Sequence, residues 1–362
     1  MIKNSNKISA FEGLICPIPL WHQEKILLGH GSGGRMTQGL IEKVFLPRFN
    51  NQALNAGNDF ASVSLIDSAT LTGSLTISTD AHIVNPIFFP GGDIGRLAIS
   101  GTVNDISMSG GKPLYVTASF IIEEGLPIEV LERIATSMKN TAEEAGVKII
   151  AGDTKVAEKN KVDKIFISTT GIGWIPPNRV INGQSAKPGD TIIISGTIGD
   201  HGIAVLAERG KLGFRTKLKS DVAPLNTLIE KILSKAPNVH VLRDPTRGGL
   251  ATTLNEIANQ SKVLITINEK EIPIRKEVLA ACEMLGFDPL YVANEGKLIV
   301  ILPPEQAEDA LQAMQTHPYG KMAKIIGFVE KPSKKGRVLL NTIIGGTRII
   351  DTLAGEMLPR IC

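Results

Sequence analysis

Cysteine and histidine are scarce in this sequence. Its 362 residues include three cysteines, Cys16, Cys282 and Cys362, and six histidines that form no HxxxH pair. Cysteines this few and this widely spaced exclude a disulfide framework and a zinc site built from one local motif. We interpret Cys16 and Cys282 as ordinary reduced thiols, because free cysteine commonly packs as a small hydrophobic residue. Cys362 is the final residue and requires a separate explanation.

Excess charge and long apolar runs are also missing. Lys and Arg total 39 against 36 for Asp and Glu, a net charge of +3 without a basic stripe, so no nucleic-acid partner is expected. No apolar run approaches the length of about 20 residues that crosses a bilayer, so no membrane association is expected. The first 25 residues lack the apolar core and cleavage site of a secretory signal. We therefore expect a cytoplasmic protein.

Apolar runs typical of strands alternate with stretches of helical periodicity. The predicted strands are residues 74–79, 113–122, 164–173, 190–195, 263–268 and 297–302. The predicted helices are residues 129–146, which Gly146 ends, and residues 225–236, which Pro237 ends. A 43% apolar content and this chain length favour more than one core. The pattern predicts a mixed α/β (α+β) fold with two domains.

A Pro- and Gly-rich segment divides the chain. Residues 174–190, WIPPNRVINGQSAKPGD, separate two parts that each contain strands and helices. We predict a first domain at 26–177 and a second at 178–350. Residues 1–25 form an extension, and residues 351–362, DTLAGEMLPRIC, form a mobile tail. Twelve extended residues reach roughly 40 Å, enough to cross a domain and enter a cleft.

Three apolar runs end in aspartate, at Asp80, Asp153 and Asp244. Carboxylates at strand ends gather on one rim of a sheet, and oxygen ligands of this kind suit Mg²⁺. The alternative is that each aspartate only caps a turn. Asn104 and Asp105 add two polar groups to a helix predicted from about Asp93. Burying such a pair is costly without a ligand, although a helix cap explains it equally well.

Glycine-rich loops before helices are a further feature. GHGSGGR, residues 29–35, contains Gly33 and Gly34, whose backbone N–H groups can face an anion. The loop matches no established phosphate-binding motif, so a tight turn is the alternative. Residues 196–202 and 243–258 contain similar loops, the second with Arg247 beside its glycines. Lys155 comes two residues after Asp153, and Glu295 lies between Asn294 and Gly296; both are further site candidates near a strand.

Taken together, these motifs resemble one family. HGSGGR, FFPGGDIGRLA, GTVNDISMSG, AGDTKV, GDHGIA, RDPTRGGLA, ANEGKL and the terminal PRIC are similar to the HypE family of carbamoyl dehydratases, which act in hydrogenase maturation. The resemblance covers about residues 25–362. PRIC at the C-terminus distinguishes this family from the wider aminoimidazole ribonucleotide synthetase-like (PurM-like) superfamily, which includes thiamine-phosphate kinases.

The resemblance implies a two-domain PurM-like fold, a homodimer, and an ATP site at the dimer interface. It implies that Asp59, Asp80, Asp105 and Asp153 bind Mg²⁺ and ATP phosphates, with Asn104 beside them. The sequence has Phe60 after Asp59 where the family usually has alanine, which puts the local packing there in doubt.

The resemblance also implies a reaction. The carbamoyltransferase HypF loads a carbamoyl group onto Cys362, ATP phosphorylates the amide oxygen, and loss of phosphate leaves a thiocyanate. The cyanide then passes to iron on the HypC–HypD complex. Lys155 and Glu295 act at the amide, and which of them is the base stays open. Two other functions are compatible with the aspartates: a small-molecule kinase or cycloligase of the same superfamily, and a non-catalytic maturation scaffold.

Overall fold

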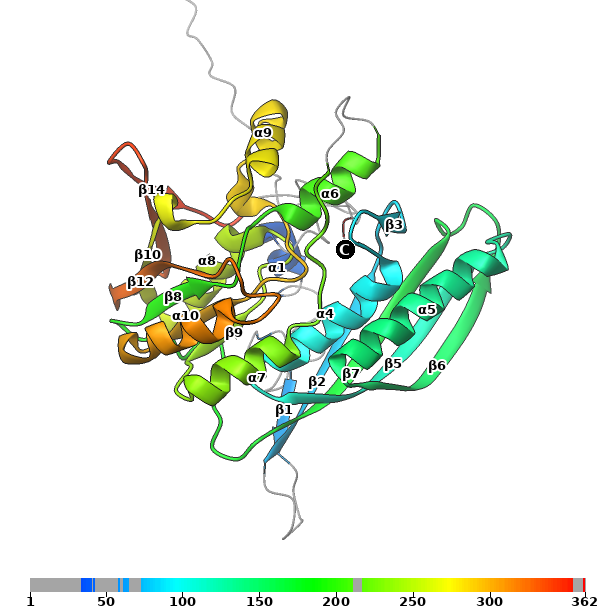
Figure 1. The fold of residues 1–362 in the computed structure, drawn as a ribbon, viewed down its shortest axis with the longest axis horizontal. Coiled ribbons are helices and arrows are strands. Elements are labelled where there is room, and N and C mark those ends of the chain that lie inside the picture. Colours follow the sequence, from blue (N-terminus) through cyan, green and yellow to red (C-terminus); the bar gives the residue numbers. More distant parts are fainter. Residues whose placement is uncertain are drawn as a thin grey trace, which may run out of the picture.

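Two lobes, each a β-sheet with helices packed against it, make up the molecule (Figure 1). The computed structural model describes residues 34–40, 42, 58, 61–64, 73–210, 217–353 and 361. The predicted mixed α/β architecture is confirmed, and all six predicted strand runs lie within or overlap strands. No helix in these ranges is long and apolar enough to cross a membrane.

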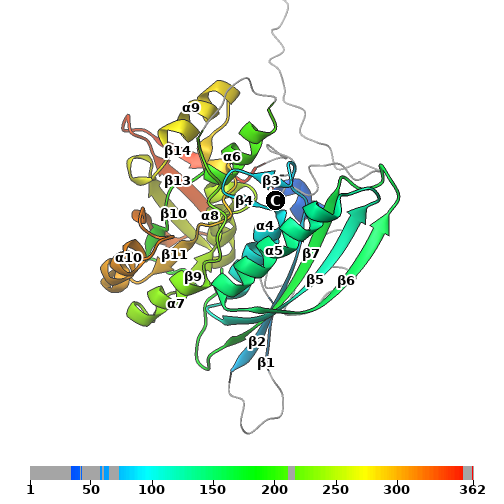
Figure 2. The same ribbon diagram turned by 45° about the vertical axis from the view of Figure 1, so that its right-hand side comes forward.

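The first lobe contains a five-stranded sheet in the order β1-β2-β7-β5-β6. Neighbouring strands are antiparallel except β5 and β6, which are parallel and are joined through helix α5. Helices α4 and α5 cover one face of this sheet (Figure 2). The bounds are β1 Ala61–Ser64, β2 Ser74–His82, β3 Phe88–Phe89, β4 Gly92–Asp93, α4 Ile94–Met108, β5 Lys112–Glu123, α5 Ile128–Ala145, β6 Lys148–Ala157 and β7 Ile165–Ile175.

The two helices of this lobe differ in burial. In α5, Ile134, Met138 and Ala142 recur every four residues and are buried, while the opposite face is exposed. The helix ends at Gly146 in the left-handed conformation, as predicted. Helix α4 is buried almost all round, because it packs between the sheet, α5 and the second lobe. It starts after Asp93, whose carboxylate accepts hydrogen bonds from the first backbone N–H groups.

The second lobe contains a seven-stranded sheet in the order β14-β13-β10-β12-β8-β11-β9. Leu250 and Leu254 of α8 pack on one face, and Leu228 and Ile232 of α7 pack on the other together with α10. The strands β8 and β11 are therefore continuous apolar runs, as expected when both faces are covered. The bounds are β8 Thr191–Ile194, α6 Asp200–Glu208, α7 Asn226–Lys235, β9 Val241–Arg243, α8 Gly249–Ser261, β10 Val263–Asn268, α9 Lys276–Leu285, β11 Ile299–Leu302, α10 Ala307–Gln315, β12 Lys324–Pro332, β13 Arg337–Asn341 and β14 Thr347–Ile350.

Short elements complete the molecule. Before the first lobe, α1 spans Arg35–Leu40, and three single-turn 3₁₀ helices lie in the second lobe at Glu269–Glu271, Pro289–Tyr291 and Pro304–Gln306. One hydrophobic cluster joins the lobes: Ile94 and Leu97 of α4 belong to it together with Ile203, Val222 and Val292 of the second lobe. A pocket lined by residues of both lobes also lies at this junction.

The prediction that Asp80 and Asp153 lie at strand ends is wrong. Strand β2 continues through Asp80 to His82, and β6 continues through Asp153 and Lys155 to Ala157. Backbone pairing causes the extension, since Asp80 lies opposite Thr169 of β7 and Asp153 lies opposite Ser119 of β5. Asp244 does follow its strand directly, as predicted.

Candidate active site

A pocket of about 180 Å³ lies where the two lobes meet. Strand β2 and helix α4 form one side of it, and two loops of the second lobe form the other. Four carboxylates and one guanidinium are among its lining residues, which are Ser78, Thr79, Asp80, Ala81, Gly101, Asp105, Asp244, Thr246, Arg247 and Glu295. Because the predicted residues Asp80, Asp105 and Glu295 all line it, the fold brings together positions that are far apart in the sequence.

Strand alternation positions the carboxylates of the first lobe. Ser78, Asp80 and His82 occupy alternate positions of β2 on the side that faces α4. Ser78 Oγ donates a hydrogen bond of 2.6 Å to Asp105 Oδ2, which joins strand to helix at the pocket. Gly101 of α4 leaves the space open, since a Cβ there would lie 3.0 Å from His82 Cε1 and 3.4 Å from Asp80 Oδ2. Asp80 and Asp105 therefore project into one space.

Asn294 ties three loops of the second lobe together. Its side-chain oxygen accepts a hydrogen bond of 2.7 Å from Gly199 N, and its amide nitrogen donates to Pro245 O at 2.9 Å and Val292 O at 3.2 Å. These bonds connect the loops GDHG, RDPTRGG and ANEGK. The buried amide uses both its donor and its acceptor, so it fixes Arg247 and Glu295 relative to each other.

Asp221 holds the backbone beside Glu295. It accepts hydrogen bonds from Glu295 N at 3.2 Å and Gly296 N at 3.3 Å, and from Lys297 Nζ at 3.0 Å. Burial alone would raise the pKa of Asp221, but the charge of Lys297 and the hydrogen bonds from Lys297 and from the Glu295 backbone outweigh it, and the pKa lies below its ordinary value. Gly296 has no space for a side chain, because a Cβ would lie 1.8 Å from Asp221 O.

The Glu295 carboxyl group is buried and only partly satisfied. The residue is 4% exposed, and its Oε1 atom has no hydrogen-bond partner among the described residues. Burial, followed by the nearby charges of Asp244 and Asp80, raises the pKa of Glu295 well above its ordinary value, which Arg247 only partly opposes. A buried carboxyl group whose pKa is raised in this way is a candidate for proton transfer.

Lys155 and Asp153 lie elsewhere in the chain. On the edge strand β6 they form an exposed ion pair of 3.3 Å. In the register of the sheet, Asp153 of β6 lies in the same row as Ala81 of β2, so its side chain points to the face opposite to Asp80. Strand β6 is three strands away from β2, a separation of about 14 Å. A single chain therefore does not bring Asp153 and Lys155 into the pocket with Asp80 and Asp105.

Asn104 connects the lobes. Its amide nitrogen donates to Ala223 O at 3.1 Å and Glu295 O at 3.5 Å, and its oxygen accepts from Leu225 N at 2.7 Å. All three partners are backbone atoms of the second lobe, and Asn104 is absent from the pocket lining. Its contacts position residues around the pocket, whereas the sequence predicts a direct nucleotide contact.

Comparison with known proteins identifies the family. Residues 58–175 match the N-terminal domain family of AIR synthase related proteins, and residues 187–339 match the C-terminal domain family. The carbamoyl dehydratase HypE of Cupriavidus necator is 51% identical over 338 residues, covering 93% of this chain and 95% of that protein. The chain belongs to the HypE family.

Two solved HypE structures have the same fold. One, of a HypE–HypF complex, has a TM-score of 0.81 and 52% identity over 87% of this chain and 99% of that chain. The other, of HypE in complex with ATP, has a TM-score of 0.77 and 49% identity over 93% of this chain and all of that chain. The predicted PurM-like fold class and family are thereby confirmed.

Three residues predicted from the HypE resemblance, Gly33, Asp59 and Cys362, lie outside the described residues, as do residues 1–25. Gly34 is buried immediately before α1 and does not line the pocket. The segment around it contacts the end of the second lobe, since Arg35 N donates to Leu353 O at 3.1 Å. Arg35 also forms an ion pair with Asp351.

The pocket has the oxygen donors of a magnesium site. Magnesium usually takes one or two protein carboxylates and completes its shell with water and phosphate oxygens. Asp80 and Asp105 fit that role because both line the pocket on the same side. Within the part of the chain that the structure describes, no group of three His, Cys, Asp or Glu side chains is arranged to hold a metal by itself.

The structure adds HypE site residues that the sequence analysis missed. Asp221, Thr246 and Asn294 lie in or behind the pocket. Asp244 was predicted as one of three aspartates at strand ends, and Arg247 as a residue beside a glycine-rich loop. Asp221 has no neighbouring motif to mark it, and only the tertiary contact with Glu295 reveals it. Asn294 stands beside Glu295 in ANEGKL, so that motif was its only sequence signal.

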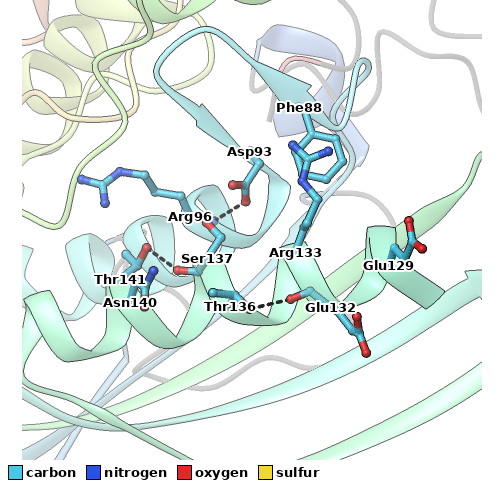
Figure 3. A pocket seen from close by; sticks show the side chains of 10 residues that line it. All are labelled: Phe88, Asp93, Arg96, Glu129, Glu132, Arg133, Thr136, Ser137, Asn140 and Thr141. Atoms are coloured by element: carbon cyan, nitrogen blue, oxygen red, sulfur yellow. Dashed lines mark hydrogen bonds between the residues drawn. The ribbon is translucent and has the colours of Figure 1, made fainter. Parts of the chain in front are cut away.

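A larger groove of about 670 Å³ on the first lobe has a different character (Figure 3). The Arg133 guanidinium lies 3.9 Å from the centre of the Phe88 ring, and Asp93 caps α4. None of the predicted site residues lines this groove. In this HypE family member, the candidate active site is therefore identified by the chemistry of its lining residues and not by the volume of its cavity.

Proposed function

We propose that this protein is an ATP-dependent carbamoyl dehydratase that converts an S-carbamoyl group on its own Cys362 into a thiocyanate. The product supplies the cyanide ligand of iron during [NiFe]-hydrogenase maturation. The observation that carries the proposal is the buried Glu295 carboxyl group beside Asp80, Asp105 and Arg247 in one pocket. Membership of the HypE family and the ATP complex of a relative support it.

The pocket has a phosphate side. Arg247 and Thr246 are donors for phosphate oxygens, and Asp80 and Asp105 are the ligands for Mg²⁺. Mg²⁺ bound there would neutralise charge on the transferred phosphoryl group. A cavity of about 180 Å³ is below the range of about 300–1,000 Å³ that encloses drug-sized ligands, so these residues hold the reacting end of the nucleotide.

The pocket also has a proton side. In the overall conversion the γ-phosphoryl group moves to the amide oxygen, the nitrogen loses both protons, and the C–O bond breaks with its electron pair leaving on phosphate. Glu295 takes a nitrogen proton, because its buried carboxyl group lines the pocket and its Oε1 atom has no hydrogen-bond partner among the described residues.

A homodimer explains the position of Asp153 and Lys155. The edge strand β6 has three exposed apolar side chains, Ile149, Ile150 and Val156, which are 41–68% exposed. In native proteins an apolar edge strand is normally covered by another segment or chain. Among the described elements, only α4 and α5 pack on this sheet, both on one face (Figure 2). A second copy covers the free face and brings its Asp153 and Lys155 to the ATP of the first copy.

Partners and location follow from the chemistry. HypF is the proposed carbamoyl donor, since a relative at 52% identity forms a HypE–HypF complex, and HypC–HypD is the proposed acceptor of cyanide. The thiol of Cys362 must stay reduced and ATP must be supplied. Both conditions are met in the cytoplasm, where we place the protein.

Mass spectrometry of the C-terminal peptide tests the function. After incubation with HypF, carbamoyl phosphate and ATP, Cys362 is expected to gain the mass of a carbamoyl group and then lose one water. Omitting ATP from the dehydration step is the control, and the carbamoyl adduct should then persist. A carbamoyl adduct that persists with ATP present would contradict the dehydratase assignment.

A further inference from the structure

The described end of the C-terminal tail is docked between the lobes. Ile361 is 5% exposed and belongs to the hydrophobic cluster that contains Phe89, Ile203 and Val222. Phe89 of β3 and Ile94 of α4 belong to the same cluster as Ile361. The residue that precedes Cys362 therefore occupies a defined site with contributions from both lobes.

One buried histidine binds the backbone of this residue. His201, in the first turn of α6, places Nε2 2.5 Å from the Ile361 carbonyl oxygen. Its Nδ1 lies 2.8 Å from Ser220 Oγ, and that oxygen accepts a hydrogen bond of 3.1 Å from Val222 N. The edge of His201 packs against Phe89 at a ring distance of 5.4 Å.

The hydrogen-bond partners determine the tautomer of His201. A carbonyl oxygen only accepts, so Nε2 must carry the proton and donate it to Ile361. Burial lowers the pKa of His201, which keeps the ring neutral although Asp221 is near. The Nδ1 atom then accepts, and the Ser220 hydroxyl donates to it. Ser220 thus selects the tautomer that binds the tail.

The tail site and the catalytic pocket share one segment. Ser220 orients His201, and the next residue, Asp221, binds the backbone of Glu295 and Gly296. Consecutive Cα atoms are about 3.8 Å apart, so the residues that hold the tail and the base are direct neighbours. Cys362 follows Ile361 by one peptide bond.

We propose that His201 and Ser220 form a latch that positions Cys362 for dehydration by binding the main-chain carbonyl of Ile361. Because the latch binds the backbone of Ile361 and not the thiol of Cys362, it can bind the tail both before and after carbamoylation. Its loss frees the tail for the transferase and slows dehydration. This role in the reaction rests on the proposed function, whereas the docking itself does not.

Alkylation of Cys362 in the full-length protein tests the latch. Iodoacetamide labelling followed by peptide mass spectrometry gives a separate rate for each cysteine. His201→Ala removes the donor and is expected to raise the Cys362 rate about five- to tenfold, the effect of losing one hydrogen bond in the docking equilibrium. His201→Gln retains an amide donor and should return the rate toward wild type.

Cys282 is the internal control. It is buried, and burial followed by the charge of Asp288 raises its pKa to about 11, so it reacts slowly unless the fold opens. His317→Ala is the matched control, because it also replaces a histidine by alanine, and the contacts of His317 are with Thr227 and Tyr319. The latch predicts a faster Cys362 rate only in His201→Ala.

Each outcome is decisive. An unchanged Cys362 rate in His201→Ala overturns the latch. If Cys282 also accelerates in that variant, His201→Gln decides: wild-type protection of Cys362 supports the latch, and loss of protection overturns it. The assay requires neither ATP nor a carbamoyl donor, so it is independent of the dehydratase assignment.

Discussion

The buried carboxyl group of Glu295 lowers the stability of the fold and at the same time provides a site for proton transfer. Its carboxyl group is buried near two other carboxylates, and one of its oxygens is unpartnered among the described residues. A buried charge without a partner opposes folding. Sites that do proton transfer commonly accept this cost because the environment sets the pKa.

Glu295→Gln is expected to stabilise the ATP-free protein at pH 8 and to abolish most of the dehydration. The pKa of Glu295 is higher in the folded than in the unfolded state. At pH values between the two pKa values, the folded state therefore binds more protons than the unfolded state. The wild-type free energy of unfolding therefore falls as pH rises through this window. Glutamine does not titrate, so the free energy of unfolding of the variant does not fall in this way. It is expected to exceed that of the wild type by about 1–2 kcal/mol at pH 8 and to differ little from it at pH 4. Urea unfolding at both pH values measures the difference.

The activity of the same variant should fall by about 10²–10⁴-fold, the usual contribution of a general base. Glu143→Gln is the control, since Glu143 is exposed on α5. A stability difference that does not change with pH would contradict the raised pKa of Glu295.

Among the elements, α4 links the two lobes to the pocket. Its N-terminal half packs in the hydrophobic cluster at the junction, and its C-terminal half presents Asn104 to the second lobe and Asp105 to the pocket. Two consecutive residues on different sides of one helix thus serve different roles. The periodicity of the helix decides which residue faces the pocket.

Asn104→Ala is expected to reduce the free energy of unfolding by about 2–3 kcal/mol, because buried backbone groups of Ala223 and Leu225 lose their partners. Urea denaturation measures the change. Asn140→Ala, on the exposed face of α5, is the control. A variant with unchanged stability that no longer binds ATP would instead support the direct nucleotide contact that the sequence predicts.

For the whole molecule, we propose that two copies contribute residues to each site. Glu295 lies in the interlobe pocket, while Lys155 lies on the edge strand of the first lobe, about 14 Å from β2. A symmetric dimer gives each pocket a Lys155 from the other chain. Each chain alone then has an incomplete site.

Mixing two inactive variants tests this arrangement. Lys155→Ala and Glu295→Gln proteins are each expected to be inactive, but after unfolding and refolding together they should recover about a quarter of the wild-type rate, since half of the dimers are mixed and each has one complete site. The rate of ATP-dependent water loss at Cys362 is the measurement. A mixture that stays inactive would assign both residues to the same chain. The double variant mixed with wild type controls for subunit exchange.

Much of the fold follows from local patterns. Six of the strands, the helix that ends at Gly146 and the helix that begins after Asp93 were predictable, because periodicity and capping are local properties. The ends of β2 and β6 were not, because pairing with β7 and β5 extends both strands past their polar residues.

The sequence by itself determined the family, the two α/β lobes and the importance of Asp80, Asp105 and Glu295, since these depend on motifs and periodicity. Only the tertiary structure decided which candidates share a pocket. It separated Lys155 from Glu295, assigned Asn104 to the lobe junction and revealed Asp221 and His201. The reason is physical: strand register and helix packing determine distances between residues that are remote in the chain, and no local pattern encodes them.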